Sequence, residues 1–294
     1  MFFEVRVPMT SANVGCGFDS VGMAYQAYSV FHFEKSDKLE FEGFEEQFCN
    51  EDNLVYIAFK EALKKINKTV KGVKISLLEQ APIARGLGSS STCVVAGIYG
   101  AYLLTDTEID KEEIFRIATD IEGHPDNVAP AIYGNLCAAC IVDGKPYNVH
   151  YNIDYRFKFM ALIPNFETKT EDARKAMPKD LPLKDAVFSL SRLGVVLRCL
   201  ENYDIDMLKD VLADKIHEPY RKKLIHEYDE VRKICEDVES YGFFISGSGS
   251  TLVNIVINDS KVKIIEERLK NLKYDWKVLF VGVDKNGTTW RKGE

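Results

Sequence analysis

Residues 82–92 read Pro82-Ile-Ala-Arg-Gly-Leu-Gly-Ser-Ser-Ser-Thr92 and lead directly into an uncharged segment. Gly86 and Gly88 permit positive φ angles and a close approach of the backbone to a ligand. Ser89 and Ser90 are residue types that cap helices, so we expect a buried helix here whose first N–H groups face outward. Such a helix start suits an anion, because free donors and the positive end of the helix dipole coincide. The pattern predicts a phosphate loop, with a plain glycine turn before a core helix as the alternative.

The composition is typical of a globular protein. The chain has 294 residues, of which 46% are hydrophobic and 28% charged, enough for two domains of ordinary size. A formal net charge of −7 argues against broad binding of nucleic acid or anionic membranes, which needs basic surface. The first residues, Met1-Phe-Phe-Glu-Val-Arg-Val7, do not resemble a signal peptide. We therefore expect a cytoplasmic protein with neither a nucleic-acid nor a membrane partner.

The seven cysteines are scattered and odd in number, which favours reduced thiols over a disulfide framework. Cys137-Ala-Ala-Cys140 has the spacing of a redox or metal site, but it lies in the apolar run Leu136–Val142 without a second cysteine pair. We therefore expect Cys137 and Cys140 to pack in a buried strand.

Runs typical of strands and helices follow two different orders along the chain. The first half combines strand-like runs at 2–7, 28–34, 39–42, 73–78 and 136–142 with helix-like runs at 54–66, 90–104 and 111–122. The second half has a strand (157–163), several helices (170–177, 183–202, 206–212 and 221–239), two strands (242–245 and 252–257), a helix (260–272) and a strand (277–283). The latter order is β-α-β-β-α-β with extra helices in the first crossover. We predict an α+β protein of two closely packed domains, 1–155 and 156–294.

The loop Thr10-Ser-Ala-Asn-Val-Gly-Cys-Gly-Phe-Asp-Ser-Val-Gly22 carries an amide and a carboxylate separated by glycines. Folded back on itself, it can present Asn13 and Asp19 to one small polar molecule. Two Asx turns in an ordinary loop are the alternative.

The segment Glu122-Gly-His-Pro-Asp-Asn127 closes an amphipathic helix. The Glu122 carboxylate is a hard oxygen ligand that suits Mg²⁺, and a serine hydroxyl of the phosphate loop can complete a partial shell. Otherwise Glu122 is a solvated residue of the last turn and His124 a polar group at a helix end.

Two further segments bring arginines to helix starts. Thr170 and Arg174 lie four residues apart and share a helix face, and His217-Glu-Pro-Tyr-Arg221 supplies a second guanidinium. Together they can clamp a carboxylate or phosphate, unless both are ordinary solvated arginines. The glycine-rich turn Ser246-Gly-Ser-Gly-Ser-Thr251 is either a flexible hairpin or part of the phosphate site.

The order of these segments resembles that of the GHMP small-molecule kinases, and more narrowly their branch that acts on homoserine. Arg85-Gly-Leu-Gly-Ser-Ser90 resembles the ATP-binding motif of the superfamily. The segments that resemble signatures of the homoserine branch are Ser11-Ala-Asn-Val-Gly-Cys-Gly-Phe-Asp19, Gly123-His-Pro-Asp-Asn-Val-Ala-Pro130 and His217-Glu-Pro-Tyr-Arg221. Ser246-Gly-Ser-Gly-Ser-Thr251 is similar to the family's third motif, so the resemblance covers nearly the whole chain.

The resemblance implies a GHMP kinase fold, in which an N-terminal domain like the second domain of ribosomal protein S5 meets a ferredoxin-like C-terminal domain at a cleft. It implies phosphorylation of the L-homoserine side-chain hydroxyl to O-phospho-L-homoserine, a step of threonine biosynthesis, with ATP and Mg²⁺ as cofactors. A homodimer is an expectation from the family alone.

Site residues are implied by the same resemblance. Those of the homoserine site are Asn13, Asp19, Asn127, Thr170, Arg174 and Arg221, with the arginines on the α-carboxylate and Asp19 on the α-ammonium. Those of the ATP site are Asn53, Arg85, Gly86, Leu87, Gly88, Ser89, Ser90, Ser91, Gly247 and Gly249. Glu122 and Ser90 are implied to hold Mg²⁺, although which of the loop serines meets the metal stays open.

Asn127 is implied to be catalytic, together with Glu122 and Ser90. It stands where the mevalonate branch has an aspartate proposed as base, and an amide cannot accept the hydroxyl proton. Phosphoryl transfer needs little base assistance when its transition state is loose, so positioning and electrostatic stabilisation are expected to suffice.

Two other functions stay open. A sister kinase of the superfamily acting on mevalonate or a sugar is disfavoured by the paired Arg174 and Arg221 with Asn127. A non-catalytic binding protein is disfavoured by the presence of Glu122 and of the glycine loop.

Overall fold

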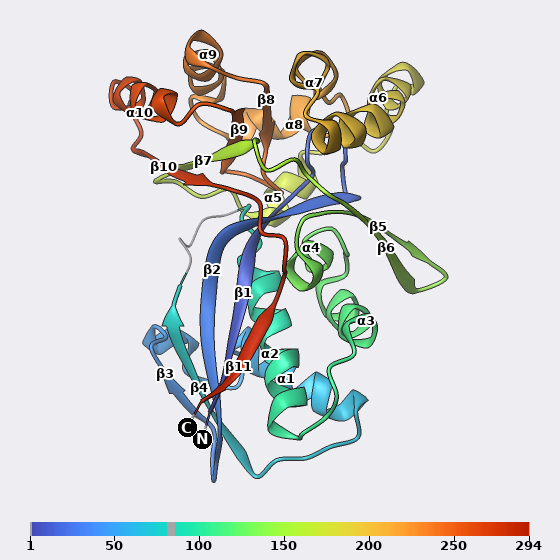
Figure 1. Ribbon diagram of the computed structural model, residues 1–294, viewed down its shortest axis with the longest axis vertical. Coiled ribbons are helices and arrows are strands. Elements are labelled where there is room, and N and C mark those ends of the chain that lie inside the picture. Colours follow the sequence, from blue (N-terminus) through green and yellow to red (C-terminus); the bar gives the residue numbers. More distant parts are fainter. Residues whose placement is uncertain (1, 81–85, 294) are drawn as a thin grey trace.

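The computed structural model describes residues 2–80 and 86–293. In that part of the chain, seven strands form one sheet, ordered β11-β1-β2-β4-β3 with β5 paired to β2 and β6 to β5. Four strands form a second sheet, ordered β10-β7-β9-β8. Figure 1 shows the two sheets in opposite halves of an elongated molecule.

The first sheet is built mainly from the N-terminal half. Its strands are β1 (Phe2–Ala12), β2 (Val21–Ser36), β3 (Glu40–Glu42), β4 (Gly72–Glu79), β5 (Leu136–Val142), β6 (Lys145–Tyr151) and β11 (Thr289–Gly293). In β1 the residues Phe3, Val5 and Val7 are buried in alternation with more exposed neighbours, because successive side chains of a strand face opposite sides. The sheet register pairs Val5 with Phe31 and shifts between Pro8 and Thr10.

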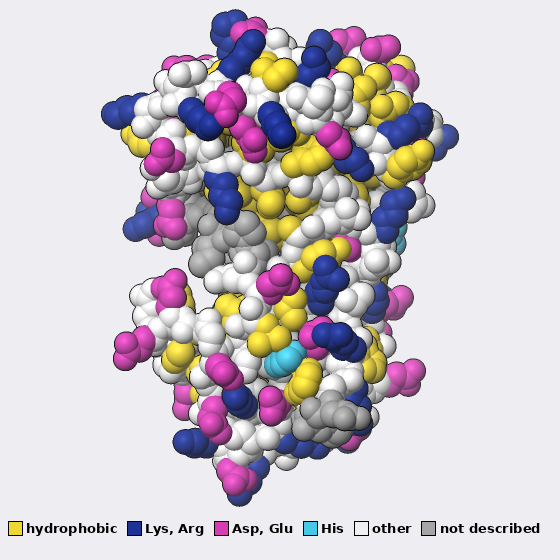
Figure 2. Space-filling model, turned by 60° about the vertical axis from the view of Figure 1, so that its left-hand side comes forward, with side chains coloured by type: hydrophobic (Ala, Val, Ile, Leu, Met, Phe, Trp, Pro, Cys, Tyr) yellow, Lys and Arg dark blue, Asp and Glu magenta, His cyan; other side chains and the backbone are white. Residues whose placement is uncertain are grey.

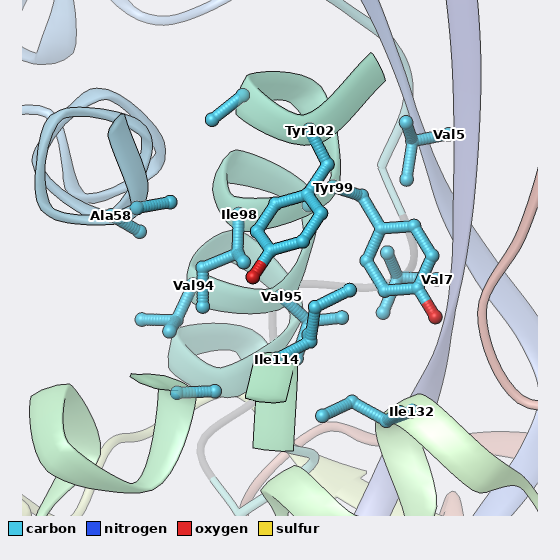
Figure 3. Packing of buried hydrophobic residues seen from close by; sticks show 14 of the residues in the cluster. Val5, Val7, Ala58, Val94, Val95, Ile98, Tyr99, Tyr102, Ile114 and Ile132 are labelled. Atoms are coloured by element: carbon cyan, nitrogen blue, oxygen red, sulfur yellow. The ribbon is translucent and has the colours of Figure 1, made fainter. Parts of the chain in front are cut away.

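Four helices cover one face of this sheet (Figure 1). They are α1 (Leu54–Lys65), α2 (Ser89–Leu104), α3 (Lys111–Glu122) and α4 (Val128–Tyr133), and a 3₁₀ turn, η1 (Glu46–Phe48), precedes α1. Helix α2 is buried along nearly its whole length, as its uncharged sequence predicts. Figure 3 shows its side chains between those of the sheet and of the other helices. At Gly97 a Cβ atom would lie 2.1 Å from the Val55 carbonyl oxygen, so α1 and α2 approach closely.

The second sheet contains β7 (Lys158–Pro164), β8 (Gly242–Ile245), β9 (Leu252–Val256) and β10 (Trp276–Val281). Numbered along the chain, its strands lie in the order 4-1-3-2 and are all antiparallel, as in a ferredoxin-like β-α-β-β-α-β unit. Its helical elements are α5 (Thr170–Lys175), α6 (Leu183–Asn202), α7 (Ile205–Val211), α8 (Glu218–Arg221), η2 (Lys222–Leu224), α9 (Tyr228–Val238), η3 (Asp259–Lys261) and α10 (Val262–Leu269). In Figure 1 the helices α6, α7, α9 and α10 form the outer end of the molecule.

Several elements differ from the sequence-based expectations. The single helix expected over 221–239 is three elements, α8, η2 and α9, because Glu227 adopts φ +58° before α9 begins. Strands β6 and β11 were not among the strands expected from the sequence. Strand β11 pairs with β1, so the chain end assigned to the second domain returns to the first sheet. The division at 155/156 itself stays a prediction.

The cysteine pair also differs from expectation. Cys137 is buried, but Cys140 is exposed near the tip of the β5–β6 hairpin, so the strand is buried only at its start. No helix in the described residues is long and apolar enough to cross a membrane. Basic and acidic side chains are interspersed over the face shown in Figure 2.

Candidate active site

A cavity of about 490 Å³ lies where β1, α2, α3, α5 and α8 come together. Both halves of the chain line it. The predicted site residues in its lining are Asn13, Asp19, Gly86, Gly88, Ser89, Ser90, Ser91, Glu122, Asn127, Thr170, Arg174, Arg221 and Gly247.

Other predicted site residues lie elsewhere. Asn53 is a buried cap of α1, since its Oδ1 accepts the Val55 N–H at 2.9 Å and its Nδ2 donates to the Phe48 carbonyl. Leu87 is fully buried in the core. Gly249 follows the lining residues Gly247 and Ser248 without itself facing the cavity. Arg85 lies outside the described residues.

The phosphate loop packs tightly on the first strand. Gly88 is the N-cap of α2 with φ +68°, and a Cβ atom there would lie 2.0 Å from Thr10 Oγ1. The expectation that Ser89 and Ser90 cap the helix is wrong, because α2 begins at Ser89 and no side chain in the described residues caps it. The first N–H groups of α2 are therefore available to an anion at the cavity.

Glu122, the last residue of α3, meets two serines of the loop. Ser90 Oγ donates to Glu122 Oε1 at 2.5 Å, and Ser91 Oγ donates to Oε2 at 2.9 Å. Ser90 is exposed to the cavity, whereas Ser91 is buried. A carboxylate beside hydroxyl oxygens is the donor set that Mg²⁺ prefers, and the open side leaves room for phosphate and water ligands. The cluster therefore fits a magnesium ion.

Asn127 lines the cavity beside the phosphate loop, since a Cβ atom on Gly88 would lie 3.2 Å from its Oδ1. Its Oδ1 accepts a hydrogen bond from Thr10 Oγ1 at 2.9 Å. The NH₂ group of the same amide is the hydrogen-bond donor that Asn127 can offer to a ligand. Asn127 is thus oriented as a hydrogen-bond donor.

Sequence reasoning missed a histidine–carboxylate pair in the lining. His124 Nδ1 lies 3.0 Å from Asp126 Oδ1, and the same oxygen accepts the Asn127 N–H at 3.0 Å. The hydrogen bond to the Asp126 carboxylate raises the pKa of His124, against the opposing effect of burial. The sequence signal for this pair is the His-Pro-Asp order within the segment 122–127. That order alone does not show that the two side chains face each other. The other unpredicted lining residues are Ala12, Leu54, Ile121, Glu167 and Ser248.

The carbonyl group of Gly247 connects the loop after β1 to Arg221 in the second half of the chain. Asn13 Oδ1 accepts the Asp19 N–H at 2.8 Å, and Asn13 Nδ2 donates to the Gly247 oxygen at 2.7 Å. Arg221 Nη1 donates to that same oxygen at 2.9 Å. Asn13 and Asp19 both have positive φ angles, so the loop is folded back as the sequence predicts.

Charges of both signs face this end of the cavity. Partial burial and the nearby Asp126 raise the pKa of Asp19, whereas Arg174 and Arg221 lower it. Arg221 is 3% exposed, and burial lowers its pKa, although guanidinium stays charged near neutrality. Carboxylates such as that of Asp19 beside two guanidinium groups are complementary to a zwitterion, which carries an ammonium and a carboxylate.

Family models match both halves of the chain. The model described as GHMP kinases N terminal domain matches residues 53–135, and the GHMP kinases C terminal model matches residues 196–275. The chain is 39% identical to the homoserine kinase of Clostridium botulinum (strain Alaska E43 / Type E3) over 295 residues, 99% of each chain. It is also 39% identical to that of Clostridium beijerinckii, over 98% of each chain.

Solved structures show the same similarity. Homoserine kinase from Cytophaga hutchinsonii superposes with a TM-score of 0.88 at 26% identity, covering 99% of this chain and 97% of that one. A putative homoserine kinase from Listeria monocytogenes superposes with a TM-score of 0.82 at 29% identity, covering 99% of this chain and 100% of that one. A mevalonate kinase at 17% identity, with a TM-score of 0.73 and coverage of 96% and 99%, shares the fold.

Proposed function

The chain belongs to the homoserine kinase branch of the GHMP kinases, and we propose how its cavity performs that activity. The γ-phosphoryl group of ATP passes to the side-chain hydroxyl of L-homoserine, giving O-phospho-L-homoserine and ADP. One observation carries the proposal: the start of α2 and the charged residues Asp19, Arg174 and Arg221 line the same cavity. An anion site and a zwitterion site therefore lie side by side.

The triphosphate lies against the start of α2 in this proposal. The backbone N–H groups that follow Gly88 donate to phosphate oxygens, and the helix dipole favours their negative charge. Ser90 and Glu122 hold Mg²⁺, which supplies neutralisation of the developing phosphate charge when bound. Ser90 is the proposed hydroxyl ligand because it is exposed to the cavity, whereas Ser91 is buried.

The amino acid binds at the other end of the cavity. Arg174 and Arg221 bind its carboxylate and Asp19 binds its ammonium group, because each pairing joins opposite charges in a partly dehydrated site. Thr170 Oγ1 lies 3.3 Å from Ser248 Oγ and joins α5 to the glycine-rich turn on this side. The reacting hydroxyl is thereby directed toward the phosphate loop.

Asn127 orients the hydroxyl group rather than deprotonating it. Its NH₂ group donates a hydrogen bond, since its oxygen is engaged by Thr10. The hydroxyl oxygen forms the new bond to phosphorus while the bond to the ADP oxygen breaks. In a loose transition state the proton leaves late, to an oxygen of the transferred phosphoryl group.

Kinases of the same superfamily that act on mevalonate or sugars are the second candidate. Mevalonate has a carboxylate but no ammonium group, and a sugar has neither. Asp19 beside two arginines therefore favours an α-amino acid over both. Self-association as a homodimer stays an expectation from the family.

A coupled assay for ADP release tests the function. The purified protein is given ATP and Mg²⁺ with L-homoserine, mevalonate or galactose in turn, and the product is identified by mass spectrometry. We expect O-phospho-L-homoserine, and loss of turnover when EDTA removes the metal. Turnover of mevalonate or galactose without turnover of homoserine would show that the substrate assignment is wrong.

A further inference from the structure

The ring of Phe18 packs against two residues of the segment that carries Arg221. Its centroid lies 5.3 Å from that of His217, with the rings 20° from parallel, and 4.9 Å from Arg221 Cζ. His217 and Arg221 are four residues apart around the short helix α8, so one ring contacts both. Phe18 immediately precedes Asp19 in the chain. The contact therefore joins the residues proposed to bind the two charged groups of the substrate.

Helix α8 is too short to hold Arg221 in place by itself. It has four residues, and helices of this length are unstable without tertiary contacts. Asp214 fixes its start, because its carboxylate accepts the N–H groups of Ile216, His217 and Glu218. That anchor lies at the end opposite to Arg221. The guanidinium itself is fixed by the Gly247 carbonyl and by the face of the Phe18 ring.

His217 supports the Phe18 ring from the other end of α8. It is fully buried, and its ring nitrogens make no hydrogen bond of full geometry to the described residues, although the Gly15 backbone interacts with the ring. Its Nε2 lies 3.8 Å from Asp214 Oδ2. Burial lowers the pKa of His217 to about 4, so the ring is neutral near neutral pH. Because no hydrogen bond of full geometry holds this imidazole, its main contribution is the packing of its ring on Phe18.

We propose that Phe18, supported by His217, is a positioning residue that sets the place of the Arg221 guanidinium relative to Asp19. The Phe18 side chain is not part of the cavity lining, so it acts through Arg221. This inference rests on the proposed function, because it assigns Arg221 to the substrate carboxylate.

Replacement of the ring tests the inference. Phe18→Leu keeps an apolar side chain but removes the aromatic face below Arg221. We expect KM for homoserine to rise roughly 3- to 20-fold, the size of a cation–π contact, while kcat and KM for ATP change less than twofold. Phe44→Leu is the matched control, because Phe44 packs on Phe41 in the first domain, and it should leave all three constants unchanged.

Two variants of the supporting residue separate ring packing from any role of the imidazole nitrogens. His217→Phe keeps an aromatic ring and should retain the wild-type KM for homoserine. His217→Leu should raise it as Phe18→Leu does. Melting temperatures of all variants are measured in parallel, so that loss of folded protein is recognised.

The outcomes separate this inference from the proposed function. Wild-type protein that does not phosphorylate homoserine refutes the function. With an active wild type, an unchanged homoserine KM in Phe18→Leu overturns the inference. Equal increases in both KM values also overturn it, because a general distortion of the cavity would then explain the loss. The inference is also overturned if KM for homoserine rises as much in His217→Phe as in His217→Leu.

Discussion

Thr10 donates its hydroxyl hydrogen to Oδ1 of Asn127 at 2.9 Å, and this contact orients an amide that lines the cavity. Thr10 is fully buried in β1, so the orientation is set by the sheet. Gly88 completes the arrangement, because a Cβ atom there would lie 3.2 Å from the same Asn127 oxygen. The phosphate loop, the strand and the amide thus pack directly against one another.

Replacement of Asn127 tests catalysis without a protein base. Asn127→Asp should lower kcat or at best leave it unchanged, because a carboxylate adds repulsion where phosphate charge accumulates. Asn127→Ala should lower kcat about 10- to 100-fold, the value of one hydrogen bond of roughly 1–3 kcal/mol. Profiles of kcat against pH provide the check. A markedly faster Asn127→Asp enzyme with a new acidic limb would contradict the positioning mechanism.

Arg174 and Arg221 should contribute unequally to the binding of homoserine. Arg221 is buried and Arg174 is exposed, so the charge pair made by Arg221 is more dehydrated. Arg221→Ala should cost about 2–5 kcal/mol in kcat/KM for homoserine, and Arg174→Ala about 1–3 kcal/mol. KM for ATP should change little in both. Larger effects on ATP than on homoserine would place the arginines at the nucleotide.

A matched pair of serine variants identifies the hydroxyl that meets the metal. Both Ser90 and Ser91 donate to Glu122 and line the cavity, but Ser90 is exposed whereas Ser91 is buried. Ser90→Ala should raise the Mg²⁺ concentration needed for half-maximal activity several-fold, and Ser91→Ala should raise it less. Glu122→Gln should have the largest effect, since it removes the charged ligand. The reverse order of the two serine variants would assign the metal to Ser91.

Glu218 should make the stability of the protein depend on pH. Burial raises its pKa to about 7, although a hydrogen bond from Tyr228 and the charge of Arg232 oppose the shift. Because the unfolded value is lower, the folded state loses stability as the pH rises through about 7. The glutamine of Glu218→Gln does not titrate. The free energy of unfolding of this variant, relative to that of the wild type, should therefore rise by up to about 3 kcal/mol between pH 5 and pH 8.5.

Urea unfolding at both pH values measures this difference. Glu267→Gln is the control, because Glu267 is exposed and paired with Lys270, and its difference from the wild type should stay constant with pH. A pH-independent difference for Glu218→Gln would show that Glu218 does not carry a raised pKa.

Local patterns were sufficient for the class of the fold and for the family. The predicted α+β fold with GHMP kinase domains is confirmed. Helix α2 follows from an uncharged segment after glycine and serine, and the ferredoxin-like order follows from the succession of strand and helix patterns. These features depend on residues close together in the chain, which is why periodicity and turn chemistry reveal them.

Tertiary structure alone decided how the polar groups are paired. The Asn13 amide bonds to Gly247, 234 residues away, and β11 returns to pair with β1. The sequence predicted that Glu122 and a loop serine share a metal ion, but not that Ser90 and Ser91 both donate to Glu122 or that His124 meets Asp126. Such pairings arise when segments distant in sequence pack on a shared core, and the free energy that selects them belongs to that packing rather than to any local pattern.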